Sequence, residues 1–390
     1  MSQKLIPYGR QSIQKSDVEA VTRVLLSDWL TQGPAIEEFE KTTASYCGVQ
    51  HAIAVSNATA GLHIACLALG VGPGDIVWTS PNSFVASSNC ALYCGAEIDF
   101  VDIEPTHFNM SVEKLQEKLV SAKKAGRLPK IVIPVHFSGH SCEMKRIAEL
   151  SKEYGFSVIE DASHALGGSY RGKKVGSCEF SDMTVFSYHP VKMITTGEGG
   201  AVLTRSSDLA HKLKQLRSHG ITRETSRMED ESHGPWYYEQ TSLGFNYRMT
   251  DIQAALGTSQ MSCLDRFVSR RRELVANYAG ALAGLPVQLP SEADGVSNSY
   301  HLYVVKLEDR IASKRRKIFE SLRADGILVN VHYIPIHTQP YYRKLGFSAG
   351  MFPESERYYA GAISLPMFPD LSDKDQAFVV ERLKAALERE

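Results

Sequence analysis

The residue with the clearest capacity for chemistry is Lys192, which follows an alternating apolar segment at 185–187 and Pro190. Proline is disfavoured inside a central strand, so we expect the chain to leave a sheet here and form an irregular loop. Glycines at 197, 199 and 200 would let this loop approach another group closely. A lysine among apolar neighbours has a lowered pKa and can act as an amine nucleophile toward a carbonyl. The alternative interpretation is an ordinary loop lysine that faces solvent.

A candidate phosphate-binding turn is Ser56-Asn-Ala-Thr59, between an apolar strand at 51–55 and a helix. Exposed backbone N–H groups and the positive end of the helix dipole make such a step favourable for a phosphate. The hydroxyl of Thr59 could add a further hydrogen bond. The alternative is plain capping of the helix by Asn57.

A candidate buried carboxylate is Asp161, which closes a strand at 157–161 and precedes Ala162-Ser-His164. A carboxylate in this position is costly to bury unless it has a partner. A protonated pyridine nitrogen would be such a partner, and holding its proton would keep the ring an electron sink. The alternative for Asp161 is a helix cap. His164 could orient Asp161 or touch the ring oxygen, and it could equally be a core histidine whose hydrogen bonds are satisfied.

Two further side chains complete the pattern. Ser187 lies five residues before Lys192 and could donate a hydrogen bond to a phosphate. Phe84 follows another strand and Pro81, and it could lie flat on a planar ring, although the usual place of a phenylalanine is the core. The phosphate-binding turn, Phe84, Asp161 and Lys192 occur along the chain in the order expected of an aspartate-aminotransferase-like cofactor site.

Composition limits the alternatives. The chain has 390 residues with 43% hydrophobic content, which allows a large core and two or three domains. The net charge of -1 provides no field for nucleic acid or an anionic membrane, and the basic clusters at 270–272 and 315–317 are interpreted as solvated helix faces. The N-terminus lacks the apolar core of a signal peptide, and polar residues interrupt the apolar region at 52–71. Seven scattered cysteines without a CxxC pair indicate no disulfide framework, no metal site and a cytoplasmic location.

Strands and helices are expected to alternate over the first part of the chain. Continuous apolar strands in such an alternation predict a parallel sheet covered on both faces, with ligands at the carboxyl ends of the strands. The helix that begins at 56–59 should bury Leu62, Ala65 and Cys66 and end near Gly70. The other expected strands are 76–79, 98–101, 130–134 and 157–161, and the other expected helices are 17–26 (capped by Ser16), 34–46, 84–93, 112–125 and 142–154.

The rest of the chain predicts a surface segment and a smaller α/β unit. Residues 222–240 are polar and charged and should form a surface loop. Helical spacing returns at 249–264, and a helix at 270–282 should lead out of the first domain. The second unit is expected to contain a strand at 301–305, a helix at 313–324, a strand at 327–332 and a final helix from Ser372.

Several motifs together resemble the DegT/DnrJ/EryC1/StrS family of nucleotide-sugar aminotransferases over nearly the whole chain. The resemblance rests on Phe186-Ser-Tyr-His-Pro-Val-Lys192, Thr195-Thr-Gly-Glu-Gly-Gly200, Asp161-Ala-Ser-His164 and Gly244-Phe-Asn-Tyr-Arg-Met-Thr-Asp251. Within the family, the chain is most similar to transaminases of pseudaminic acid biosynthesis, through Ser27-Asp-Trp-Leu-Thr-Gln-Gly33, Arg217-Ser-His-Gly220 and Val331-His-Tyr-Ile-Pro335. Ala58 and Tyr188 stand where many relatives have glycine and phenylalanine.

This resemblance implies an α/β protein with the fold of the type I pyridoxal 5′-phosphate-dependent transferases. It implies a large cofactor-binding domain at 1–264 with a mostly parallel seven-stranded sheet, a smaller C-terminal α/β domain at 265–390, and a homodimer with active sites at the interface. Lys192 would carry the cofactor as a Schiff base, with Asp161 and His164 as the other catalytic residues. Asn246 would reach the cofactor phosphate of the neighbouring subunit. The other cofactor-binding residues would be Ala58, Thr59, Phe84 and Ser187, and the substrate-contacting residues would be Tyr8, Asp28, Trp29, Leu30, Thr31, Ser187, Asn246, His332, Tyr333, Ile334 and Pro335.

The resemblance also implies a reaction. L-Glutamate would donate its amino group to the C4 ketone of UDP-2-acetamido-2,6-dideoxy-β-L-arabino-hexos-4-ulose, giving UDP-4-amino-4,6-dideoxy-N-acetyl-β-L-altrosamine and 2-oxoglutarate. The main alternative is a 4-aminotransferase for another nucleotide sugar, of the bacillosamine or perosamine type. A 3-dehydrase of the same fold would have histidine in place of Lys192, and a catalytically silent regulator would have lost Lys192, Asp161 or the glycine loop.

Overall fold

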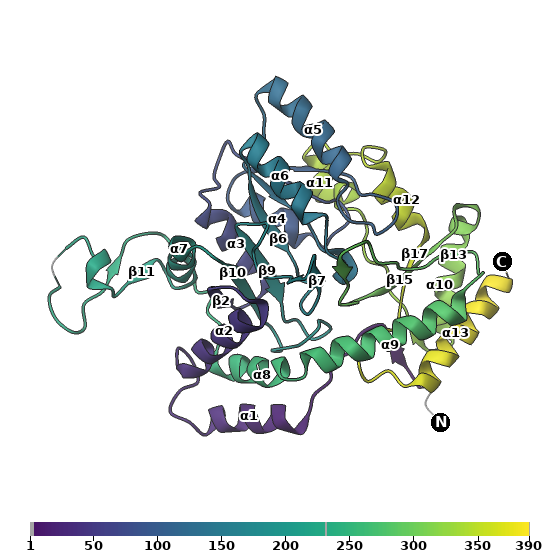
Figure 1. Cartoon of the computed structure of the whole chain (residues 1–390), viewed down its shortest axis with the longest axis horizontal. Coiled ribbons are helices and arrows are strands. Elements are labelled where there is room, and N and C mark those ends of the chain that lie inside the picture. The colour runs from purple at the N-terminus through teal and green to yellow at the C-terminus, as the bar shows by residue number, and fades with distance from the viewer. Residues whose placement is uncertain (1–3, 231, 390) are drawn as a thin grey trace.

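A seven-stranded sheet forms the centre of the larger part of the chain (Figure 1). The computed structural model describes residues 4–230 and 232–389. Across the sheet, the strands are β2 (His51–Val55), β10 (Gly200–Thr204), β9 (Met183–Ser187), β6 (Ser157–Asp161), β5 (Ile131–Ile133), β3 (Ile76–Thr79) and β4 (Glu97–Phe100). Strand β10 is antiparallel to both of its neighbours, and the other neighbouring strands are parallel. The prediction of a mostly parallel sheet is confirmed.

Helices cover both faces of this sheet, as the alternation along the sequence predicts (Figure 1). One face packs against α3 (Ala58–Ala68), α4 (Ala86–Tyr93) and α7 (Ser207–Arg217). The other face packs against α2 (Pro34–Cys47), α5 (Val112–Ala125), α6 (Met144–Tyr154) and α8 (Asp251–Met261). Within residues 4–230 and 232–389, no helix has the length and hydropathy needed to span a bilayer.

The C-terminal part forms a smaller core of its own around Tyr278, Tyr303 and Leu322. Its three-stranded antiparallel sheet has the order β13-β15-β17. The main elements are α9 (Leu264–Leu282), β13 (Val287–Gln288), β15 (Tyr303–Leu307), α10 (Arg315–Ala324), β16 (Ile327–Leu328), α12 (Pro353–Gly361), β17 (Ala362–Leu365) and α13 (Asp373–Glu388). The short elements are η3 (Asp309–Lys314), η4 (Ile336–Thr338) and α11 (Pro340–Lys344). Strand β14 (Val296–Ser297) pairs instead with a hairpin of β7 (Ser169–Tyr170) and β8 (Lys173–Lys174).

Helix α9 connects the two cores. Its first turns place Leu264 and Phe267 in the core under the large sheet, whereas Leu274 and Leu282 belong to the smaller core. The N-terminus also crosses between the parts, because β1 (Ile6–Pro7) pairs in parallel with β16. The domain boundary predicted at 264/265 falls at the start of α9, and the assignment of two domains stays a prediction.

Several expected elements differ in the structure, and the helix predicted at 270–282 begins already at Leu264. Helix α1 (Lys15–Leu25) begins before Ser16, so the cap predicted there is wrong; instead, the carboxylate of Asp17 accepts from the backbone N–H of Gln14 at 2.8 Å. The described residues of the segment 222–240 include the ends of a short hairpin of β11 (Ile221–Thr222) and β12 (Glu239–Gln240), with η2 (Thr225–Arg227) between them, and they project from the sheet (Figure 1). The strand predicted at 327–332 ends at Leu328, because residues after it turn toward a cavity.

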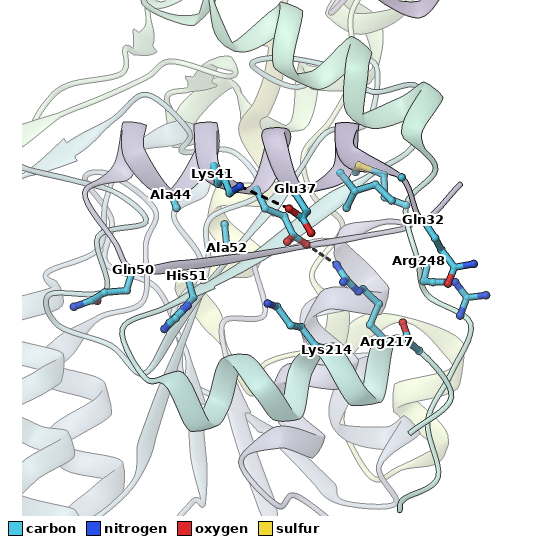
Figure 2. A pocket seen from close by; sticks show the side chains of 15 residues that line it. Gln32, Glu37, Lys41, Ala44, Gln50, His51, Ala52, Lys214, Arg217 and Arg248 are labelled. Atoms are coloured by element: carbon cyan, nitrogen blue, oxygen red, sulfur yellow. Dashed lines mark hydrogen bonds and ion pairs between the residues drawn. The ribbon is translucent and has the colours of Figure 1, made fainter. Parts of the chain in front are cut away.

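The exposed edge of the large sheet is closed by an ion pair (Figure 2). Strand β2 is the edge strand, and its Ala54 directs its backbone N–H and C=O away from the sheet. Glu40 on α2 accepts from this N–H at 2.8 Å, Arg217 on α7 donates to this C=O at 2.8 Å, and the two side chains pair at 2.6 Å. Both charges are largely buried, in a groove of about 520 Å³. The pair therefore blocks the addition of another strand at this edge.

Replacing Arg217 with alanine is expected to lower the free energy of unfolding by about 3 kcal/mol, because the carboxylate of Glu40 and the carbonyl of Ala54 lose their partner while buried. Urea denaturation followed by circular dichroism measures this change. Lys41→Ala is the matched control, since Lys41 is 79% exposed and pairs with Glu37 only at 3.6 Å. It should cost no more than about 0.5 kcal/mol. Equal losses for the two variants would contradict a structural role for the buried pair.

Candidate active site

A cavity of about 730 Å³ lies at the carboxyl ends of the parallel strands. Strands β2, β3, β6 and β9 all end beside it, and each is followed by polar residues at its rim. The structure brings ten of the predicted site residues together in its wall: Tyr8, Ala58, Thr59, Phe84, Asp161, His164, Ser187, Lys192, His332 and Tyr333. The topology of the sheet therefore gathers segments that are far apart in sequence.

Lys192 lies on the irregular loop predicted after β9, and its side chain lines the cavity. The loop turns back at this point through a hydrogen bond from the backbone N–H of Lys192 to the carbonyl of His189. Burial lowers the pKa of Lys192 to about 8, and the opposing effect of the negative Asp161 is smaller. The uncharged fraction of this amine near neutral pH is therefore larger than that of an exposed lysine, although the protonated form is still the more abundant.

Asp161 is 5% exposed at the end of β6 and accepts hydrogen bonds from two serines. One carboxylate oxygen accepts from the hydroxyl of Ser87 at 2.6 Å, and the other accepts from the backbone N–H and the hydroxyl of Ser163. Because Ser87 gives its proton to the carboxylate, Ser83 must be the donor in the 2.7 Å bond between the two hydroxyls. These bonds give both carboxylate oxygens of Asp161 a partner in its buried position.

The first turn of α3 provides unpaired backbone donors at the rim of the cavity. Asn57 caps the helix by accepting from the N–H of Ala60 at 2.9 Å. Among the described residues, the N–H groups of Ala58 and Thr59 have no acceptor, so capping and anion binding are compatible here. Gly200 allows β10 to start close to this turn, because a Cβ at that position would lie 2.7 Å from the nitrogen of Ala58.

His164 and Tyr333 form a hydrogen-bonded pair whose protons can be assigned. Nδ1 of His164 accepts from the backbone N–H of Ser138 at 3.2 Å, and its Nε2 lies 3.0 Å from the hydroxyl oxygen of Tyr333. Burial and the charge of Lys192 hold the pKa of His164 well below its usual value, so the ring is neutral. Its one proton is then on Nε2 and is donated to Tyr333. The hydroxyl proton of Tyr333 is left for a ligand in the cavity.

The opposite rim is aromatic. Phe84 is 59% exposed although it lies at the cavity, with its ring 6.4 Å from that of Tyr333. The ring of Tyr8 lies 5.1 Å from the imidazole of His332. An exposed phenylalanine at a cavity leaves a ring face that a planar ligand can cover.

The remaining predicted site residues do not line this cavity. Ile334 is exposed and Pro335 is buried beside η4. Asn246 is exposed, and the segment 28–31 is also at the surface, where Trp29 is 55% exposed. The segment 28–31 lies near the segment that contains Asn246, because Thr31 pairs with Thr250 and the N–H of Gly33 donates to Asp251. The predicted residues therefore form two groups, one in the cavity and one on a separate surface.

The polar residues at the cavity that were not identified as site residues from the sequence include His189, Glu198, His301 and Asn330. For two of these residues, the sequence contains a pattern that could have indicated a site. His301 and Asn330 are polar residues inside the expected strands 301–305 and 327–332, where an apolar core residue would be usual. Their positions in the small unit gave no indication that they would face the end of the large sheet.

These features fit pyridoxal 5′-phosphate. An amine with a lowered pKa, a buried carboxylate, an exposed phenyl ring and unpaired N–H groups are the partners that its aldehyde, pyridine nitrogen, ring face and phosphate require. The chemistry of the donor set therefore agrees with this cofactor.

Comparisons with known proteins support the same identification. Residues 11–384 match the DegT/DnrJ/EryC1/StrS aminotransferase family. The chain is 37% identical to the UDP-4-amino-4,6-dideoxy-N-acetyl-beta-L-altrosamine transaminase of Campylobacter jejuni, over 99% of this chain and 98% of the relative. It is also 37% identical to the spore coat polysaccharide biosynthesis protein SpsC of Bacillus subtilis, over 97% and 96%. The solved structure of Helicobacter pylori PseC, an aminotransferase involved in the biosynthesis of pseudoaminic acid, superposes with a TM-score of 0.91 at 31% identity, covering 99% of this chain and 100% of that chain.

The family match spans almost the whole chain, and the likeness to PseC extends over both parts of the fold. Aminotransferases of this family depend on pyridoxal 5′-phosphate, in agreement with the groups that line the cavity. The chain therefore belongs to the DegT/DnrJ/EryC1/StrS family of aminotransferases.

Proposed function

We propose that this aminotransferase transfers the amino group of L-glutamate to the C4 ketone of UDP-2-acetamido-2,6-dideoxy-β-L-arabino-hexos-4-ulose. The products are UDP-4-amino-4,6-dideoxy-N-acetyl-β-L-altrosamine and 2-oxoglutarate. The observation that carries the proposal is the position of Lys192, whose amine faces the same cavity as Asp161 and the unpaired N–H groups of α3. The similarity to the altrosamine transaminase and to PseC supports this substrate.

In this proposal, different residues of the cavity hold different parts of the cofactor. Bound pyridoxal 5′-phosphate supplies an aldehyde that accepts the amino group and a ring that withdraws electrons. Lys192 would hold the aldehyde carbon covalently, and Asp161 would pair with the pyridine nitrogen. Phe84 would cover one ring face, and Ala58, Thr59 and Ser187 would hold the phosphate.

The same lysine moves the protons. Once released from its covalent link, the Nζ of Lys192 takes the proton from Cα of the amino donor, and it later delivers a proton to C4 of the sugar. A pKa near 8 suits both roles, because the amine can lose and gain a proton near neutral pH. His164 holds the hydroxyl of Tyr333 as a donor toward the cavity, where it can bind an oxygen of the cofactor or the substrate.

We infer that a second copy of the chain completes the site. Asn246 and the segment 28–31 are expected from the family resemblance to contact cofactor and substrate, but neither lines the cavity of its own chain. They lie together on another surface, held near each other by the Thr31–Thr250 pair. A homodimer in which this surface faces the partner's cavity would bring both groups into one active site.

The seven free cysteines of the chain fit a cytoplasmic location.

A second candidate function is a 4-aminotransferase for another nucleotide sugar, of the bacillosamine or perosamine type. The chain is as similar to SpsC, a protein of spore coat polysaccharide biosynthesis, as it is to the altrosamine transaminase, and this equal identity supports the second candidate. The two reactions differ in the sugar and in the face of C4 that receives nitrogen. NMR of the product separates them.

The function is tested by supplying the UDP-linked 4-keto sugar and L-glutamate to the purified enzyme and following the amino sugar by NMR. Wild-type protein should form the product, and Lys192→Ala should lose turnover by at least about a thousandfold, because it lacks both the covalent attachment and the proton carrier. After borohydride reduction, peptide mass spectrometry should find the pyridoxyl group on Lys192. Lys173→Ala, an exposed lysine outside the cavity, is the control. A pyridoxyl group on another residue, or full turnover by Lys192→Ala, would refute the proposal.

The lowered pKa of Lys192 predicts how cofactor attachment depends on pH. The neutral amine is the nucleophile, so the rate at which apoprotein takes up pyridoxal 5′-phosphate should rise as pH increases through about 8 and then level off. An exposed lysine has its ordinary pKa, so a lysine model compound should continue to gain rate up to about pH 10. Stopped-flow absorbance measures both rates. An inflection for the protein near pH 10 would show that Lys192 is not desolvated.

The second copy is tested by mixing two inactive variants. Asn246→Asp should impair catalysis by placing a negative charge beside the phosphate, and Lys192→Ala is inactive for the reason given above. If Asn246 serves the partner's cavity, one site of each mixed dimer is intact, and co-expression should restore about a quarter of wild-type activity. Native mass spectrometry, which resolves the mass change caused by Lys192→Ala, confirms that mixed dimers have formed. No recovery in a sample that contains mixed dimers would place Asn246 in the site of its own chain.

A further inference from the structure

Three buried histidines, His164, His301 and His332, face the cavity, and two of them have partners for both ring nitrogens. His164 bonds to the backbone of Ser138 and to Tyr333. His332 lies 2.7 Å from the hydroxyl of Ser364 and 3.4 Å from the amide nitrogen of Asn330. His189, also at the cavity, is exposed to solvent. Among the described residues that line the cavity, His301 is therefore the buried histidine without side-chain hydrogen bonds.

The imidazole of His301 is 3% exposed, and its Nδ1 is buried without a hydrogen-bond partner in the described part of the chain. Its ring lies 4.5 Å from that of His164. Burial, followed by the charge of Lys192, holds the pKa of His301 well below its usual value, so the ring is neutral and keeps one donor and one acceptor. Buried polar groups in folded proteins nearly always have a partner, so an unpaired imidazole at a cavity points to a ligand.

Arg271 lies behind His301 and gives this side of the cavity a positive potential. Its side chain is fully buried and donates from Nη1 to the carbonyls of Tyr300, His301 and Met367. Its Nε and Nη2 have no partner, and no carboxylate pairs with it, among residues 4–230 and 232–389. Burial lowers the pKa of Arg271 to about 10, which leaves it charged at neutral pH. A buried cation without a counter-ion favours an anion nearby.

The amino donor carries such an anion. Its α-carboxylate is attached to the carbon whose proton the Nζ of Lys192 removes, so the carboxylate must bind within the cavity close to that amine. In the cavity wall formed by the described residues of one chain, Lys192 is the only lysine or arginine, and it is occupied by the reaction. Another group in this wall is the unpaired imidazole of His301, which has the charge of Arg271 behind it.

We propose that His301, supported by Arg271, is the binding site for a carboxylate of the amino donor. This assignment rests on the proposed transamination and adds the residue that receives the amino acid. The imidazole N–H donates to the carboxylate oxygen, and Arg271 acts through the His301 backbone and its field without contacting the ligand. The UDP-sugar, which presents its neutral ring to this part of the cavity, does not depend on His301.

The test uses maleate, a dicarboxylate with neither an amino nor a keto group, and isothermal titration of the holoenzyme. His301→Ala should raise the Kd for maleate by at least about tenfold, since it removes a hydrogen bond to a charged group. The Kd for UDP should stay within about twofold. His140→Ala is the matched control, because it removes a buried imidazole outside the cavity and should leave both constants unchanged. In steady-state kinetics, the KM for L-glutamate should rise while the KM for the sugar nucleotide stays constant.

Two conservative variants keep the test valid if His301→Ala does not fold. His301→Asn places an amide near the position of Nδ1, and His301→Gln places one near Nε2, so at least one of them should restore maleate binding. A folded His301→Ala with unchanged affinity for maleate would overturn the assignment, and so would an equal loss of UDP affinity. The result is separable from that of the proposed function, because the pyridoxyl group on Lys192 is detected independently of maleate binding.

Discussion

The structure depends on lowering the pKa of one amine next to one buried carboxylate. Lys192 and Asp161 face the same cavity, and their opposite charges would normally favour the protonated amine. Burial has the larger effect and lowers the pKa of Lys192 to about 8. The hydrogen bonds from Ser87 and Ser163 orient the carboxylate of Asp161, so the two groups can carry out different tasks in one cavity.

The buried histidines around this pair are kept uncharged. The neutral states of His164, His301 and His332 follow from burial and from the positive charge of Lys192, which makes a second cation unfavourable. Neutral imidazoles can both donate and accept, and the bond from Ser138 determines which nitrogen of His164 carries the proton. The cavity therefore provides directed hydrogen bonds, while fixed positive charge is placed behind it at Arg271.

The residues that stabilise the fold and the residues that carry the chemistry lie in different parts of the large sheet. The apolar cores on the two faces of the sheet hold the strands, and the edge strand β2 is closed by Glu40 and Arg217 on helices from opposite faces (Figure 2). The chemical groups lie at the strand ends, where loops can present polar side chains without disturbing the core. Helix α9 connects the small unit to the core under the large sheet, and the β1–β16 pair ties the N-terminal segment to the small unit. The segment after β16 contributes His332 and Tyr333 to the cavity.

Much of the local structure was predictable from the sequence for a simple physical reason. The apolar runs at 51–55, 76–79 and 157–161 form strands as expected, and the helix predicted at 112–125 has the bounds of α5. Lys192 was predicted to lie on an irregular loop because Pro190 cannot continue a central strand. Ser16 was wrongly predicted as a cap because a nearby Asp17 provides the stronger acceptor for the helix start.

The sequence by itself determined the chemical types and their order: a helix start with unpaired N–H groups, a strand-ending carboxylate and a loop lysine, all of which follow from local propensity. Only the tertiary structure decided which residues meet. The antiparallel direction of β10, the end of β16 at Leu328 and the position of His301 at the cavity depend on contacts between segments far apart in the chain. Such contacts are chosen by packing and burial over the whole molecule, so no local pattern contains them.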